Sequence, residues 1–271
     1  MSTSSTTSKE ARWQRALVTG ASSGIGEGFA RLLAAEGSDL VLVARRKERL
    51  ERLARELRER HGVSVEVCVA DLTDPDQLQS VADLLANSVR HVDLLINNAG
   101  DHKGIAPFIE LDINSLEKDA MINGLAVLRL THAAASVMKN RGRGNIINLS
   151  SGVSFYPAPG QATYAATKAF VNNLSEAVNH ELRGTGVRVT TICPGFTRTD
   201  LPTRLGYEEG KIPRMLWMNP EDVARKGLNA ASRGTSLYSP GLMNRMGAWW
   251  GTHLPRWIVL RWVSTFFTPS R

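Results

Sequence analysis

An apolar run is followed at once by Thr19-Gly20-Ala21-Ser22-Ser23-Gly24-Ile25-Gly26, and an amphipathic run begins where these residues end. Gly20 suits a tight turn, Gly24 lets a phosphate approach the backbone, and Gly26 lets a helix pack closely on the strand. The free N–H groups and the positive dipole end of that helix favour a pyrophosphate. A glycine-rich turn in this context predicts a dinucleotide-binding loop. Its candidate residues are Gly20, Ser22, Ser23, Gly24, Ile25 and Gly26.

Short apolar runs alternate with longer amphipathic runs along most of the chain. The apolar runs, which are typical of parallel strands covered on both faces, are Ala16–Thr19, Leu40–Val43, Val63–Val69, Val92–Ile96, Asn145–Leu149 and Val187–Ile192. The amphipathic runs predict helices at Ile25–Glu36, Lys47–Arg60, Pro75–Ser88, Ser115–Lys139, Thr163–Arg183 and Val223–Ser232, with a last edge strand at Thr235–Tyr238. The alternation predicts an α/β protein with a single doubly wound parallel β-sheet, a Rossmann fold, and helices on both faces.

The composition limits the class of protein. The 271 residues are 42% hydrophobic, which is enough for one large core, and we expect one domain at residues 13–240. No run reaches the roughly 18 consecutive apolar residues of a membrane span, and the polar residues 1–12 predict a disordered tail rather than a signal peptide. Cys68 and Cys193 lie in apolar runs and predict reduced thiols in a cytoplasmic protein. The sequence shows no Cys/His cluster with metal-site spacing, so we expect no metal.

The second predicted strand is followed by Arg45 and Arg46. In dinucleotide-binding folds this strand end faces the adenosine ribose, where an acidic residue binds a 2′-hydroxyl and an arginine accommodates a 2′-phosphate. No acidic residue stands here, so the sequence favours NADP over NAD. The alternative is that both arginines only begin the charged, solvated helix Lys47–Arg60.

A second group of polar residues joins the end of one predicted strand to the next helix. Tyr164 and Lys168 are four residues apart on Thr163–Arg183 and therefore share one helical face. A free phenol has a pKa of about 10, and a neighbouring ammonium lowers that pKa toward neutrality. Ser151 follows the run Asn145–Leu149, where its hydroxyl can bond the same substrate oxygen. These residues predict a proton donor (Tyr164), a cation that lowers its pKa (Lys168) and a hydroxyl that positions the substrate (Ser151). Tyr-x-x-x-Lys alone, however, also occurs by chance in helices.

Further motifs accompany the glycine-rich turn and the Tyr164/Lys168 pair, and the full set is Thr19–Gly26, Asp71, Asn97–Gly100, Asn123, Ser151, Tyr164, Lys168 and Pro194-Gly195. Taken together, these motifs resemble the short-chain dehydrogenase/reductase family over about residues 16–199. The resemblance implies that Asn123 holds a water in a proton relay to Lys168, and that Lys168 also binds the nicotinamide ribose. The other cofactor contacts that it implies are Asp71, Leu72, Asn98, Ala99, Gly100, Tyr164, Pro194, Gly195, Thr197 and Thr199. The pattern is most similar to the NADP-preferring reductases of ketones, hydroxysteroids and 3-ketoacyl groups.

Several of these residues also have a purely structural interpretation. Asp71 could cap the helix that begins at Pro75, although Asp74 is placed for the same task. Asn123, next to Gly124, could be a packing residue, but an amide in the middle of a helix favours a function. The six histidines have no motif around them, and we expect all of them to be structural or exposed; they are His61, His91, His102, His132, His180 and His253.

The expected function is an NADP(H)-dependent oxidoreductase that moves hydride between nicotinamide and a carbonyl or secondary alcohol. We expect an apolar ketone, steroid-like or 3-ketoacyl substrate, and a homodimer or homotetramer. The alternative is a non-catalytic sensor or scaffold that binds the dinucleotide without turning it over. A proton donor is of no use to a binding module, so the set Asn123, Ser151, Tyr164 and Lys168 argues against this alternative.

The chain after Gly195 carries less information. Residues 196–218 predict a substrate-covering loop, and residues 241–271 predict a basic, aromatic, amphipathic extension with a helix from Arg256 to Phe267. No acidic residue follows Asp222. Three covers for the apolar side of this extension stay open: its own domain or a sister subunit, an apolar substrate, or an anionic membrane surface. The charge alone does not indicate nucleic-acid binding.

Overall fold

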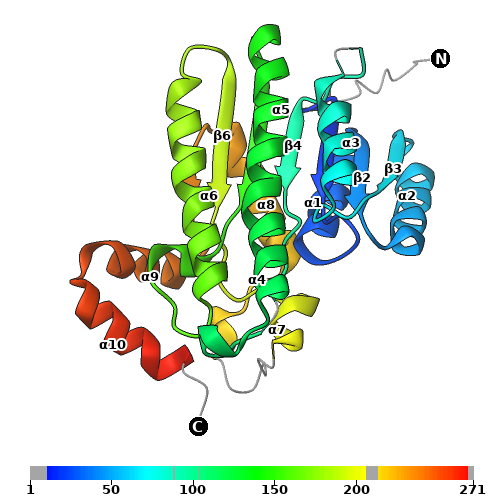
Figure 1. The fold of residues 1–271 in the computed structure, drawn as a ribbon. Coiled ribbons are helices and arrows are strands. Elements are labelled where there is room, and N and C mark those ends of the chain that lie inside the picture. Colours follow the sequence, from blue (N-terminus) through cyan, green and yellow to red (C-terminus); the bar gives the residue numbers. More distant parts are fainter. Residues whose placement is uncertain (1–10, 88, 103, 206–212, 268–271) are drawn as a thin grey trace, which may run out of the picture.

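One parallel sheet of seven strands forms the centre of the computed structural model, which describes residues 11–87, 89–102, 104–205 and 213–267 (Figure 1). The strand order is β3-β2-β1-β4-β5-β6-β7, and every neighbouring pair is parallel. The strands are β1 (Arg15–Thr19), β2 (Asp39–Ala44), β3 (Val65–Val69), β4 (Leu94–Asn97), β5 (Gly144–Leu149), β6 (Val187–Ile192) and β7 (Leu237–Tyr238). The predicted doubly wound fold is confirmed.

Helices cover both faces of the sheet and create two hydrophobic cores. One face carries α1 (Gly24–Ala35), α2 (Lys47–His61) and α8 (Pro220–Ser232); the other carries α3 (Pro75–Ala86), α5 (Ala126–Arg141) and α6 (Ala162–Glu181). Successive residues of a strand point to opposite faces. In β1, Ala16 and Val18 therefore enter the first core while Leu17 enters the second. This explains why the strands read as continuous apolar runs.

The edge strand β3 differs from its prediction. It begins at Val65 rather than Val63, and most of its residues are only half-buried. Because β3 pairs with β2 alone, it lacks cover along its outer side, and Val69 is 47% exposed. The other predicted strands and helices agree with the structure to within three residues, except for one long helix.

The prediction of one continuous helix at Ser115–Lys139 is wrong. The structure has α4 (Ile113–Ala120), a π-helical turn η2 (Met121–Leu125), and then α5. The amide of Asn123 donates to the backbone carbonyl of Asp119, the acceptor that a regular helix would offer to the N–H of residue 123. A π-turn of this kind is frequent at functional sites.

The span Ile113–Arg141 is also the one helix of the described part of the chain that is long and apolar enough to cross a membrane. Half of its most apolar window is buried inside the fold. It packs on α3, α6, β4 and β5, as a core helix does.

Two further helices follow the sheet. The chain leaves β7 through α9 (Leu242–His253), which lies in the predicted extension but whose bounds were not predicted, and then α10 (Arg256–Phe267), which begins directly after Pro255. Both lie to one side of the sheet, at the lower left of Figure 1. Gly251 of α9 lies against Phe155, and Trp250 meets Trp262 of α10 edge-on at 6.5 Å.

Parts of three predicted segments lie outside the described residues: residues 1–10 of the tail, 206–212 of the substrate loop and 268–271 of the extension. The described part of the substrate loop contains α7 (Asp200–Arg204) and the 3₁₀ turn η4 (Arg214–Leu216).

Candidate active site

The glycine-rich loop lies at the carboxyl end of β1 and is fixed to the end of β4. Gly20 and Gly24 have φ values of +66° and +59°, which favour glycine. The Thr19 hydroxyl accepts the backbone N–H groups of Asn98 and Ala99, each at 3.0 Å, and the Asn98 amide donates to the Thr19 carbonyl at 2.9 Å. Gly26 leaves no room for a Cβ beside the Gly20 carbonyl. The loop is thus held in place before any ligand binds.

The two arginines after β2 have different partners. Arg46 donates to the hydroxyls of Ser22 at 2.9 Å and Ser23 at 2.6 Å, so its guanidinium lies on the glycine-rich loop. It also lies 3.5 Å from the Asp200 carboxylate of α7. Arg45 instead lies 3.6 Å from the carboxylate of Asp71. Both cations are at the carboxyl edge of the sheet.

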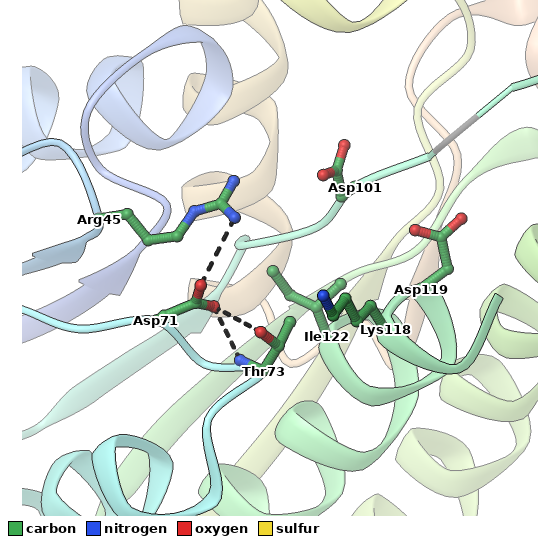
Figure 2. Close-up of a pocket in the computed structure, with 7 residues that line it drawn as sticks. All are labelled: Arg45, Asp71, Thr73, Asp101, Lys118, Asp119 and Ile122. Carbon is green, nitrogen blue, oxygen red and sulfur yellow. Dashed lines mark hydrogen bonds and ion pairs between the residues drawn. The ribbon is translucent and has the colours of Figure 1, made fainter. Parts of the chain in front are cut away.

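A cavity of about 160 Å³ opens beside Arg45 (Figure 2). Arg45 and Asp71 lie on one side, and Asp101 and Asp119 lie on the other; Thr73, Lys118 and Ile122 complete the lining. Burial alone raises the pKa of Asp71, but hydrogen bonds from Thr73 and the charge of Arg45 outweigh it, so the pKa is lowered. The N-cap of α3 is Asp74, whose side chain accepts the N–H groups of Asp76 and Gln77. Asp71 therefore does not cap this helix.

The remaining cofactor candidates lie at the same edge. Leu72 is buried after β3, Ile25 is half-buried at the start of α1, and Gly100 follows β4. The Pro194 carbonyl accepts the N–H of Gly152 at 2.8 Å, and Gly195 lies against Asn244 of α9. The Thr197 hydroxyl donates to the Gly195 carbonyl at 3.1 Å, while the Thr199 side chain lies against Gly24. Residues from five strand ends therefore converge on one region.

The Ser151, Tyr164 and Lys168 side chains meet between β5 and α6. Ser151 follows β5; its hydroxyl accepts the N–H of Val153 at 3.4 Å and lies near the phenol of Tyr164. The Lys168 ammonium lies 5.6 Å from the centre of the Tyr164 ring and donates to the Leu149 carbonyl at 3.0 Å.

The pKa of the phenol differs from the expectation. Burial raises the pKa of Tyr164, and it outweighs the hydrogen bond with Ser151, which acts in the opposite direction. Burial also lowers the pKa of Lys168 from 10.5 to about 8. The ammonium bonds the Leu149 carbonyl rather than the phenol. The expected lowering of the Tyr164 pKa by Lys168 is not seen in this arrangement.

Asn123 places an acceptor beside Lys168. Its side chain is fully buried, and its amide nitrogen donates to the backbone carbonyls of Asp101 at 2.7 Å and Asp119 at 3.0 Å. Its Oδ1 has no hydrogen-bond partner within the described residues. A Cβ built on Gly100 would lie 2.8 Å from this oxygen and 3.6 Å from Lys168 Nζ. A buried acceptor without a protein partner fits an ordered water.

His102 is a site residue that sequence reasoning missed. Its ring is 6% exposed and lies 4.6 Å from the ring of Tyr164, between centres. It lines a second, small cavity with Tyr164, Gln161 and several apolar residues, among them Phe108, Leu111 and Leu116. Its only sequence signal was its position two residues after Gly100, in the loop that follows β4.

The family model for short chain dehydrogenases matches residues 14–210. The chain belongs to the short-chain dehydrogenase family. Sulfoacetaldehyde reductase 2 of Chromohalobacter salexigens is 40% identical over 187 residues, which are 68% of this chain and 73% of that protein. A very-long-chain 3-oxoacyl-CoA reductase of Neurospora crassa is 32% identical and covers 95% of this chain and 75% of its own.

A solved short-chain dehydrogenase from Sphingobium yanoikuyae, in complex with NADPH, is similar in structure. It is 36% identical, has a TM-score of 0.79, and covers 93% of this chain and 91% of its own. This short-chain dehydrogenase is therefore an oxidoreductase, and the enzyme interpretation of its sequence is confirmed.

Proposed function

We propose that this short-chain dehydrogenase transfers hydride between NADP(H) and a carbonyl or secondary alcohol, with Tyr164 as the acid or base. The observation that carries the proposal is that Tyr164 and Lys168 lie on one face of α6, with the hydroxyl of Ser151 near the phenol. A general acid and a hydrogen-bonding hydroxyl on one substrate oxygen suit carbonyl reduction. The non-catalytic alternative is not favoured, because it leaves this arrangement without a use.

The residues present fit NADP(H). The glycine-rich loop at the start of α1 accommodates a pyrophosphate, and Arg46 accommodates a 2′-phosphate while its serine partners orient it. Asp71 and Leu72 would contact the adenine, Asn98–Gly100 would line the cofactor cleft, and Pro194–Thr199 would cover the nicotinamide. The cofactor supplies or accepts the hydride. The protein supplies orientation, exclusion of water and the proton.

In the reductive direction, Tyr164 donates its proton to the substrate oxygen while Ser151 donates a hydrogen bond to the same oxygen. Lys168 would hold the nicotinamide ribose and, once its ammonium turns toward the phenol, would stabilise the phenolate. Asn123 Oδ1 holds the water through which Lys168 exchanges a proton with solvent.

The small second cavity supports the proposed substrate class. Its apolar lining by Phe108, Leu111 and Leu116 beside Tyr164 suits an apolar ketone, a steroid-like ketone or a 3-ketoacyl group. The 3-oxoacyl-CoA named for one relative belongs to the last of these classes. A panel of such ketones and alcohols, followed by NADPH absorbance, tests the proposal; no turnover of any carbonyl or alcohol contradicts it.

Cofactor preference gives a first prediction. We expect NADPH to bind at least about tenfold more tightly than NADH, because a charge-assisted hydrogen bond contributes about 1.5–3 kcal/mol. Arg46→Ala and Arg45→Ala should both weaken NADPH binding, with the larger effect at Arg46, whose guanidinium lies on the glycine-rich loop. The affinity for NADH should barely change. Fluorescence titration of each variant with both cofactors measures these affinities.

The matched control is Arg55→Ala, which removes an exposed arginine of α2, the helix that begins after Arg46. Its cofactor affinities should equal those of the unmutated protein. Equal affinity of the unmutated protein for NADPH and NADH would overturn the proposal for the 2′-phosphate site.

We propose further that the chain assembles into a homodimer or homotetramer in the cytoplasm. The supporting observation is a group of exposed apolar side chains on α5, on α6 and at the end of η2: Leu125, Leu128 and Phe170. Cys68 and Cys193 are both free thiols, as expected for a reducing compartment. Sedimentation velocity measures the assembly, and a purely monomeric protein at micromolar concentration contradicts it.

The α9–α10 pair provides a separate surface, which we propose contacts an anionic membrane. Its exposed apolar side chains are Leu242, Met243, Met246, Trp249, Trp250, Trp257, Leu260 and Trp262. Arg245, Arg256 and Arg261 are exposed on the same two helices, which contain no acidic residue. Tryptophan beside arginine in the absence of acids complements an anionic lipid surface.

The membrane proposal predicts co-sedimentation with vesicles that contain phosphatidylserine, at low salt. Deleting residues 255–271 should abolish this binding, and high salt or pure phosphatidylcholine should weaken it. If the full-length protein stays in the supernatant with both lipids, the exposed face of α9–α10 is covered by protein instead.

A further inference from the structure

His102 forms part of the wall beside the proposed acid. Its ring and that of Tyr164 are tilted by 30° with centres 4.6 Å apart, which is within the range of favourable aromatic contacts. The histidine is buried, whereas Tyr164 is half-buried. Contact with an immobile ring restricts the positions that the phenol can take.

Hydrogen bonds on both sides of the imidazole hold it still. The backbone N–H of Gly104 donates to Nδ1 at 3.2 Å, so Nδ1 must carry a lone pair. The proton of the neutral ring is therefore on Nε2, which donates to Gln161 Oε1 at 3.1 Å. Burial lowers the pKa of His102 and outweighs the hydrogen bond to Gln161 and the charge of Asp101, which both act in the opposite direction. Geometry and burial agree on a neutral ring.

The segment around His102 connects the two ends of the proposed proton path. Gln161 is the residue directly before α6, the helix that carries Tyr164, and the N–H of Ala106 donates to the neighbouring Gly160 carbonyl at 3.2 Å. On the other side, the Asp101 carbonyl holds the amide of Asn123. Consecutive residues thus fix Asn123 through a carbonyl and Tyr164 through a ring.

We propose that His102 is a positioning residue, whose neutral ring holds the Tyr164 phenol against Ser151 and shields it from water. This inference rests on the proposed function, in which Tyr164 is the acid. Small displacements of a reacting group can cost up to about a hundredfold in rate. Removing the ring should therefore lower kcat and also change the pKa of the phenol.

The pKa effect has a definite sign. Burial is the largest influence on Tyr164 and raises its pKa. The other groups that face the phenol are Ser151, Lys168 and Asp119, and none of them changes when His102 is replaced. Replacing the ring with a methyl group admits water, which lowers the cost of the phenolate and moves the pKa of Tyr164 downward.

The experiment compares His102→Ala with His102→Phe, which keeps an aromatic ring but loses both hydrogen bonds. We expect kcat to fall about ten- to a hundredfold in the alanine variant and to recover part of that loss in the phenylalanine variant, which keeps the ring contact with Tyr164 but not the hydrogen bonds that fix the ring. NADPH affinity should stay the same in both, which also shows that the variants are folded. Ultraviolet difference absorbance of tyrosinate, with Tyr164→Phe subtracted to identify the signal, measures the pKa of Tyr164 without any substrate.

The matched control is His132→Ala, which removes an exposed histidine on α5 and should change neither readout. An unchanged tyrosinate titration in His102→Ala overturns the proposal, and so does a phenylalanine variant that is as impaired as the alanine variant. If the unmutated protein reduces no carbonyl, the proposed function fails, while the tyrosinate titration still decides whether His102 governs the phenol.

Discussion

Tyr164→Phe should lower kcat by at least about a hundredfold, the lower end of what general acid–base catalysis contributes. The substitution removes only the phenol hydroxyl near Ser151, and it leaves the ring that contacts His102 in place. Cofactor affinity should change little, because the glycine-rich loop and Arg46 do not depend on this hydroxyl. Initial rates on a working ketone, together with fluorescence titration with NADPH, measure the two effects separately.

Tyr238→Phe is the matched control, since it removes a tyrosine hydroxyl from β7 rather than from α6. We expect its turnover to equal that of the unmutated protein. Turnover by Tyr164→Phe close to that of the unmutated protein would remove Tyr164 from the mechanism and leave Ser151 and Lys168 as structural residues.

The catalytic geometry depends on parts of the chain that are far apart in sequence. Ser151 comes from the end of β5, Tyr164 and Lys168 from α6, and Asn123 from the π-turn η2. Because parallel strands all end at one edge of the sheet, residues after β1, β2 and β4 meet there as well. The backbone hydrogen bonds from Asn98 and Ala99 to Thr19 fix the cofactor loop relative to β4. The fold thus preorganises the site before any ligand arrives.

Local sequence patterns were sufficient to predict the fold. The apolar runs and the glycine-rich turn are periodic or positional signals, and each depends on neighbours within a few residues. The π-turn could not be found in this way, because it depends on whether the Asn123 side chain takes the carbonyl of Asp119. The partial exposure of β3 depends on strand order, which a run of residues does not encode.

The site was predictable wherever a motif has a fixed spacing, as with Tyr164 and Lys168. The different partners of Arg45 and Arg46 were not predictable, because they depend on how β2 meets the loops after β1 and β3. His102 was not predicted as a site residue for a similar reason, because its contact with Tyr164 joins residues 62 positions apart. Contacts of this kind are created by tertiary packing alone.

Lys168→Met should abolish turnover and yet stabilise the protein at pH 7. Lys168 is 5% exposed, and its pKa falls from 10.5 to about 8 through burial, so at neutral pH the native state holds an ammonium at a cost of about 3 kcal/mol. Methionine removes that charge at similar volume.

The contribution of Lys168 to the pH dependence of the free energy of unfolding has a clear sign. Between pH 8 and 10.5 the unfolded chain binds more protons than the native protein at this residue, so the stability of the unmutated protein rises with pH through that window. The methionine variant should lack this rise. Urea unfolding of both proteins at pH 7 and at pH 9, without cofactor, measures the difference, and Lys226→Met serves as an exposed-lysine control that should change neither stability nor its pH dependence. A methionine variant that is less stable than the unmutated protein at pH 7 would mean that the hydrogen bond from Lys168 to the Leu149 carbonyl outweighs the burial of its charge.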